Sequence, residues 1–152
     1  MPLTVNGIPE ITALAGRDLG RSAWKEVTQP LIDAFADVSG DHQWIHTDVD
    51  RAAQGPFGRT IAHGYMILSW GVPMFAELLR VTGVGMALNY GVNKVRFPAP
   101  VPIGSRVRLH AVVSEVREVS RGGVQMHRQF TFELEGSEKP ACAAESLTHF
   151  YP

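Results

Sequence analysis

The sequence predicts a single α+β domain over residues 1–152, in which one curved antiparallel sheet packs against one long helix. The apolar residues of 61–80 recur at helical spacing over the longest such stretch in the chain. Four later segments instead alternate between apolar and polar residues with the period of a strand. No internal repeat or linker divides the 152 residues, which is the usual length of one domain.

The first forty residues predict short elements. A helical turn is expected over 11–15, ended by Gly16, and a short strand over 24–28. Thr28 is suited to cap a following helix, because its hydroxyl can accept from a free backbone N–H and Pro30 is tolerated in the first turn. This helix should end at Ser39–Gly40 and carry an apolar stripe formed by Leu31, Ala34, Phe35 and Val38.

Two further helices are predicted before the strands begin. Asp48 is expected to cap a short helix over 49–54 that ends at Gly55–Pro56. The long helix over 61–80 is apolar all round, so protein should surround it on both sides. Pro73 is expected to kink it or to separate its last turns.

The second half of the chain predicts four strands, over 86–97, 107–113, 124–134 and 141–151. The segment 120–123, Ser-Arg-Gly-Gly, has the composition of a hairpin turn. The proline-rich segment 98–104 must be a connection, because proline cannot donate a hydrogen bond to a sheet. Alternation is clearest in 124–134, where the apolar residues are Val124, Met126, Phe130, Phe132 and Leu134.

A single sheet with one long helix has one natural packing solution, in which the sheet curls around the helix, the hot-dog arrangement. A sheet of this size covers only one side of the helix. The other side should therefore face a second copy of the chain, so we expect a homodimer.

The composition excludes several classes of protein. Hydrophobic residues make up 45% and charged residues 19%, as in ordinary globular proteins, and the formal net charge is −1. Lysine and arginine are scattered, so a nucleic-acid partner is not expected. No apolar segment is continuous enough for a membrane span, and the first residues lack the features of a signal peptide. With Cys142 as the only cysteine, we expect a cytoplasmic protein.

Asp41 and His46 are the candidate catalytic pair. Residues five apart do not share a face on a helix or on a strand, so only a loop would bring them together. Gly40 supplies the backbone freedom for such a loop. A carboxylate and an imidazole that converge can perform general acid–base chemistry on water. The same spacing also fits a surface loop with a capping aspartate and a solvated histidine, and spacing alone leaves both interpretations open.

The segment around this pair resembles the signature of the MaoC-like, R-specific enoyl-CoA hydratases and dehydratases. Gln43 stands where that family usually has asparagine, and Trp44 replaces a proline. The resemblance extends to 60–64 and to 93–101. The residues that match the signature are Phe35, Val38, Ser39, Gly40, Asp41, Ile45, His46 and Ala52.

The resemblance implies a hydro-lyase that adds water to trans-2-enoyl-CoA and gives (R)-3-hydroxyacyl-CoA, reversibly. Asp41 and His46 would activate the water that attacks C3 and would then protonate C2. The backbone N–H of Gly64, at the start of the long helix, would bind the thioester oxygen. No metal is expected, because the thioester is already activated, and no cofactor is expected, because coenzyme A is part of the substrate. Residues that could contact the substrate are Gln43, Trp44, Ser69, Asn93 and Arg96, whereas His63 is expected to be a hydrogen-bonded structural residue.

Three alternatives remain at this point. A 3-hydroxyacyl dehydratase of fatty-acid synthesis would act on acyl-carrier-protein substrates, but no basic patch for an acidic carrier is evident. A hot-dog thioesterase would need a carboxylate on or near the long helix, and Glu77, the only acid on it, lies far from Gly64. A non-catalytic acyl-thioester-binding hot-dog subunit would be expected to lack Asp41 or His46, and neither is missing.

Overall fold

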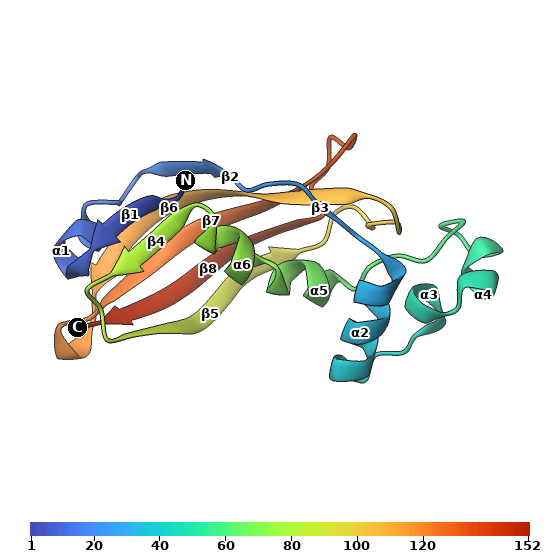
Figure 1. Cartoon of the computed structure of the whole chain (residues 1–152), viewed down its shortest axis with the longest axis horizontal. Coiled ribbons are helices and arrows are strands. Elements are labelled where there is room, and N and C mark those ends of the chain that lie inside the picture. The colour runs from blue at the N-terminus through green and yellow to red at the C-terminus, as the bar shows by residue number, and fades with distance from the viewer.

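In the computed structural model, which describes all 152 residues, a long curved sheet carries helices on one of its faces (Figure 1). The strand order is β2-β6-β7-β8-β5, β3 also pairs with β6, and every pairing in this sheet is antiparallel. The α+β class with a curved antiparallel sheet is therefore confirmed. The strands are β2 (Asp18–Arg21), β3 (Lys25–Glu26), β5 (Met86–Arg96), β6 (Arg106–Glu118), β7 (Val124–Leu134) and β8 (Cys142–Tyr151).

The four strands predicted in the second half are all present, and β7 has the predicted bounds. Alternation explains this accuracy, because the inward side chains of β6 are fully buried from Val107 to Val113 while their neighbours are less so. The hairpin between β6 and β7 contains the short 3-10 turn η1 (Ser120–Gly122), in which Arg121 has a φ of 61°.

The predicted single helix over 61–80 is wrong in its extent. The structure has two short helices, α5 (Gly64–Ser69) and α6 (Gly71–Ala76), that meet at Trp70. Pro73 has no N–H to offer the carbonyl of Ser69, which accounts for an interruption at this point. Ile61 instead donates to the carbonyl of Ile45 (3.0 Å), so the residues before Gly64 are not helical.

After α6, strand β4 (Leu79–Thr82) pairs in parallel with β1 (Leu3–Asn6), and the two form a separate two-stranded sheet. The sequence analysis did not predict these two strands or β2. The first helix, α1 (Gly7–Thr12), also begins earlier than the predicted turn over 11–15, and β3 covers only part of the strand predicted over 24–28. Short elements without a clear alternation are thus the ones that the sequence analysis misplaced.

Helix α2 (Gln29–Ser39) follows the prediction at both ends. Thr28 occupies the N-cap position, although its side chain makes no capping hydrogen bond, and Gly40 ends the helix with a φ of 80°. The apolar stripe proposed for this helix is largely at the surface. Ile32 and Ala36 are the buried residues, whereas Val38 is 88% exposed.

Two shorter helices follow, α3 (Trp44–Thr47) and α4 (Val49–Ala53). The side chain of Asp48 accepts a hydrogen bond from the backbone N–H of Arg51 (3.0 Å), as the predicted N-cap requires. Helices α2 to α4 project beyond one end of the sheet, at the right of Figure 1. This part of the chain carries the predicted catalytic pair.

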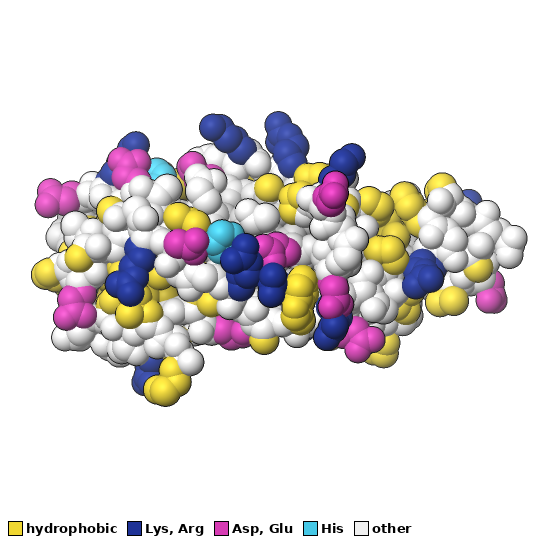
Figure 2. Space-filling view, turned by 90° about the horizontal axis from the view of Figure 1, so that it is seen from above, with side chains coloured by type: hydrophobic (Ala, Val, Ile, Leu, Met, Phe, Trp, Pro, Cys, Tyr) yellow, Lys and Arg dark blue, Asp and Glu magenta, His cyan; other side chains and the backbone are white.

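The core lies between the concave face of the sheet and helices α5 and α6. Two neighbouring surfaces that are rich in apolar residues stay open to solvent: Tyr65 and Val72 on the helices, and Met86, Leu88, Tyr90 and Val92 on the edge strand β5. Acidic and basic side chains are interspersed over the face that Figure 2 shows. None of the helices is both long enough and apolar enough to cross a membrane.

Candidate active site

Asp41 and His46 lie on opposite sides of a short connection. Asp41 directly follows Gly40, the left-handed residue that ends α2, and His46 belongs to α3. The Nε2 atom of His46 is 4.0 Å from the Oδ2 atom of Asp41. The predicted loop thus supplies the carboxylate, and a short helix that was not predicted supplies the imidazole. Their catalytic role stays a prediction.

The protonation of His46 follows from its hydrogen bond. Its Nδ1 atom lies 2.7 Å from the carbonyl oxygen of Ile61, and because a carbonyl only accepts, Nδ1 must carry the proton. In the neutral ring Nε2 is then an unprotonated acceptor that faces Asp41. Burial lowers the pKa of His46 below the ordinary 6.5, with a smaller contribution from His63, although the Ile61 hydrogen bond and Asp41 act the other way.

Asp41 has the opposite environment. Its side chain is 51% exposed, against 8% for that of His46. One carboxylate oxygen, Oδ1, accepts weakly from the backbone N–H of Gln43 (3.3 Å), and the backbone N–H of Asp41 donates to the hydroxyl of Ser39 (3.2 Å). These bonds hold the loop while leaving Oδ2 free on the side of His46. A solvated carboxylate and a buried neutral base therefore face each other.

His63 contacts both His46 and the backbone of Asp41. Its ring stacks on that of His46 with centroids 3.8 Å apart, and its Nε2 atom donates to the backbone carbonyl of Asp41 (2.9 Å). The residue is 2% exposed, and its Nδ1 atom has no hydrogen-bond partner. Both contacts fit the structural role predicted for His63, since they tie the Asp41 loop to the start of α5.

The side chains of Asp41, His46 and His63 could each offer one ligand atom to a metal ion, because these three atoms lie within 4.8 Å of one another. The donor geometry fits poorly. His46 Nδ1 and His63 Nε2 already bond to backbone carbonyls. The two rings are stacked with only 23° between their planes, so their remaining lone pairs run side by side rather than toward one point.

A cavity of about 270 Å³ opens beside His46, between the start of α5 and the segment after β5. Gly64 lines it and is the first residue of α5, where the backbone N–H has no acceptor within the helix. A Cβ atom at Gly64 would approach the ring of Phe97 to 2.9 Å. Glycine is therefore needed here for close packing against Phe97, a contact that the sequence analysis did not foresee.

The other predicted substrate contacts are placed less favourably. Trp44 packs against Gly55 and stacks with Arg51, with 4.3 Å between the guanidinium carbon and the ring centroid, and it does not line the cavity beside His46. The side chain of Gln43 is exposed, as is Ser69, whose hydroxyl donates to the carbonyl of Met66 (2.7 Å). These positions do not bring the three side chains into the cavity.

Asn93 and Arg96 lie at the end of β5. Asn93 donates to the carboxylate of Glu145 (3.0 Å), and Arg96 is exposed and donates to the carbonyl of Val95 (2.8 Å). Neither lines the cavity beside His46. Glu77, the acid considered for a thioesterase, does not line the cavity beside His46, and it accepts a hydrogen bond from the backbone N–H of Ala23 (2.8 Å).

Comparison with known proteins agrees with this architecture. Residues 10–131 match the family described as MaoC like domain. The chain is 49% identical over 147 residues to 3-hydroxyacyl-thioester dehydratase Z of Mycobacterium tuberculosis, covering 97% of both chains. It is 40% identical over 143 residues to nodulation protein N of Rhizobium leguminosarum, covering 93% of this chain and 89% of the relative.

Solved structures extend the likeness to the fold. The (R)-hydratase from A. caviae superimposes with a TM-score of 0.70 at 23% identity, covering 91% of this chain and 96% of the other. The prediction of a hot-dog fold is therefore confirmed, with the helical part divided at Trp70 rather than continuous.

Proposed function

The chain belongs to the family of MaoC-like domains, and we propose that it is a hydro-lyase that interconverts trans-2-enoyl-CoA and (R)-3-hydroxyacyl-CoA. The observation that carries the proposal is the facing pair of Asp41 Oδ2 and His46 Nε2, at 4.0 Å, beside the cavity that Gly64 lines. The name of the 49% identical relative, a 3-hydroxyacyl-thioester dehydratase, supports the substrate class. The R configuration rests on the family resemblance.

In the proposed hydration, a water molecule is held between Asp41 and His46. A polar pair separated by 4.0 Å is too far apart for a direct hydrogen bond, and a bridging water suits such a gap. Neutral His46 accepts a proton from this water at Nε2 as the water oxygen bonds to C3. The C2–C3 π electrons move toward the thioester, and C2 then takes a proton from the Asp41–His46 pair. Dehydration follows the same steps in reverse.

The N–H of Gly64 would stabilise the charge that develops on the thioester oxygen. It is a backbone donor without an intrahelical acceptor, and it opens into a cavity with mostly apolar walls. One preorganised donor of this kind can lower a barrier by about 3 kcal/mol. The chemistry proposed here moves water and protons only, so we propose that no cofactor is required beyond the coenzyme A of the substrate.

Loss of enoyl-thioester absorbance on a chain-length series of enoyl-CoAs tests the proposal. We expect saturable hydration by the full chain and release of the R product, identified by an R-specific dehydrogenase. The same acyl chains on an acyl-carrier protein provide the matched comparison. A preference for the carrier protein would reassign the enzyme to fatty-acid synthesis, and no hydration of either series would contradict the proposed reaction.

We further propose that the chain forms a homodimer in the cytoplasm. The dimer is supported by exposed apolar side chains on α2, on α5 and α6, and on the edge strand β5, including Val38, Tyr65 and Tyr90. A sheet edge with such residues is a ready surface for a second copy. Sedimentation should give twice the chain mass of 16.6 kDa at micromolar concentration, and a stable monomer would contradict this assembly.

A further inference from the structure

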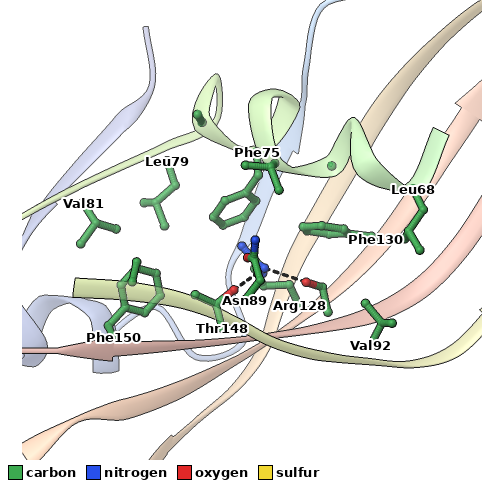
Figure 3. A pocket seen from close by; sticks show the side chains of 15 residues that line it. Leu68, Phe75, Leu79, Val81, Asn89, Val92, Arg128, Phe130, Thr148 and Phe150 are labelled. Carbon is green, nitrogen blue, oxygen red and sulfur yellow. Dashed lines mark hydrogen bonds between the residues drawn. The ribbon is translucent and has the colours of Figure 1, made fainter. Parts of the chain in front are cut away.

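A second cavity, of about 350 Å³, lies farther along the same helices, between α6, β5 and the sheet (Figure 3). Ten of its fifteen lining residues are hydrophobic, yet Arg128 of β7 is also one of its lining residues. Arg128 is only 6% exposed. It occupies an inward position of β7 between Met126 and Phe130, where the alternation of the strand calls for an apolar residue.

The guanidinium of Arg128 is held by two aromatic rings and two hydroxyls, without a counter-charge. Its central carbon lies 4.4 Å from the ring centroid of Phe75 and 4.8 Å from that of Phe130. Nη2 donates to the hydroxyls of Ser146 (2.6 Å) and Thr148 (2.5 Å) from the neighbouring strand. No carboxylate of the chain pairs with it, and burial alone lowers its pKa to about 10, so the group stays cationic at neutral pH.

The remaining donors of this guanidinium are unused. Nε is buried and has no partner, and Nη1 makes no hydrogen bond although it is not enclosed by protein. Asn89 of β5 lines the same cavity (Figure 3). It stands opposite Thr148 in the strand register, and Thr148 accepts a hydrogen bond from Arg128. Nη1 is thus the donor that can meet a ligand in the cavity, and a charged N–H of this kind is a strong donor to a carboxylate oxygen.

The cavity with Arg128 lies along the same helical segment as the cavity beside His46. Gly64 and Ile67 line the cavity beside His46, whereas Leu68, Gly71 and Phe75 line the one with Arg128. These positions follow one face of α5 and α6, and the seven steps from Gly64 to Gly71 span roughly 10 Å at the rise of a helix. An aliphatic chain could therefore follow the apolar walls between the two cavities.

We propose that Arg128, with Asn89, forms a binding site for the carboxylate of an aliphatic chain. That carboxylate belongs either to a free aliphatic acid or to the far end of an acyl thioester bound at Gly64. The binding site stands on the geometry of the second cavity. Only the second source rests on the proposed function.

Titration calorimetry with octanoate, and with 1-octanol as the uncharged probe of equal length, tests the site directly on the full chain. We expect one octanoate per chain, bound at least about tenfold more tightly than octanol, as a hydrogen bond to a charged group implies. Arg128→Gln should abolish this preference. Arg117→Gln is the matched control, because Arg117 is exposed and pairs with Glu115 on β6, and it should leave octanoate binding unchanged.

Asn89→Leu provides a second variant, because the side chain of Asn89 makes no hydrogen bond within the chain. Asn89 belongs to β5, part of the proposed dimer surface, so sedimentation of this variant must give the wild-type mass. The substitution should weaken octanoate binding about threefold or more. No preference of the wild type for octanoate over octanol would overturn the proposal. A preference for octanoate that persists in folded Arg128→Gln would also overturn it. If Arg128→Gln does not fold, unchanged octanoate binding by Asn89→Leu would overturn it instead.

Kinetics then identify the source of the carboxylate. A trans-2-enoyl-CoA with a free carboxylate at its far end is compared with its methyl ester in wild type and Arg128→Gln. A lower KM for the free acid in the wild type alone assigns the site to substrate, and equal KM values with octanoate binding intact assign it to a free acid. Failure to hydrate any thioester would contradict the proposed function, while the octanoate result would still decide this proposal.

Discussion

The two polar centres of this molecule, at Asp41–His46 and at Arg128, treat charge in opposite ways. At the first, the carboxylate is half exposed and the buried partner is a histidine whose pKa burial lowers, so no buried charge persists at rest. At the second, the buried group is an arginine that keeps its charge and has no acid beside it. A group that gains and loses a proton suits catalysis, whereas a fixed buried cation suits the binding of an anion.

The largest effect should come from breaking the first centre. Asp41→Asn and His46→Gln are nearly isosteric, and each should lower kcat for crotonyl-CoA hydration by about 10²- to 10⁴-fold with little change in stability. If both side chains act on one water, the double variant should have nearly the same kcat as the slower of the two single variants. Losses that multiply would place the two residues in separate steps. A single variant with most of its activity would show that this residue is structural.

Gly64 tests the link between the cavity and the reaction. Gly64→Ala should lower kcat at least about tenfold, less than the 10²- to 10³-fold cost of deleting an oxyanion donor, since the N–H remains. The cause would be the ring of Phe97, which a Cβ would approach to 2.9 Å, so adding Phe97→Ala should restore part of the activity. Gly91→Ala is a suitable control, because its Cβ would meet nothing closer than 3.9 Å. Normal turnover by Gly64→Ala would show that the close contact with Phe97 is not needed to hold the Gly64 N–H in place.

The pH dependence should report the neutral state of His46. Because burial lowers its pKa, kcat/KM should fall only as the pH drops below 6.5, with a midpoint under that value. His42→Gln is the control. The imidazole of His42 is exposed, and its hydrogen bond to Asp37 raises its pKa, so its removal should leave the midpoint in place. A midpoint above 6.5 would contradict a neutral His46 as the base.

The same shift has a consequence for stability. The folded state holds His46 with a lowered pKa, so the unfolded chain takes up this proton first as the pH falls. The contribution is fully present above pH 6.5 and is lost as the pH falls through the folded pKa. Urea unfolding over this range should show a smaller decrease in the unfolding free energy for His46→Gln than for the wild type.

The sequence predicted the sheet better than the helices for a physical reason. In β7 the side chains alternate between core and surface over 124–134, and this pattern can be read without tertiary structure. The helical limits at 61–80 depend on tertiary contacts, such as the bond from Ile61 N–H to Ile45 O, that leave no mark on apolar periodicity. The apolar stripe of α2 could likewise be recognised in the sequence. That Val38 would remain exposed could not.

The two centres differ in the same respect. The spacing of Asp41 and His46 left two interpretations open, and the family resemblance favoured a catalytic pair; the structure places the two side chains 4.0 Å apart. The stacking of His63 on His46 and the contact of Phe97 with Gly64 join residues distant in sequence, and no local pattern announces them. Arg128 did leave a signal, since it interrupts the apolar positions of β7. The sequence analysis did not interpret that interruption, although β7 is an inner strand of the sheet.

The smallest expected effect separates a binding cation from a structural one. If Arg128 is present for an anion, Arg128→Met should change the unfolding free energy by less than about 1 kcal/mol, because a buried unpaired charge contributes little net stability. Thr148→Val should cost more, about 1–3 kcal/mol, because it removes an acceptor from a cation that stays buried. Both are measured by urea unfolding at one protein concentration, since a dimer's stability depends on it. A loss of more than about 3 kcal/mol in Arg128→Met would make the guanidinium part of the fold itself, and the contrast between the two centres would then be one of packing rather than of function.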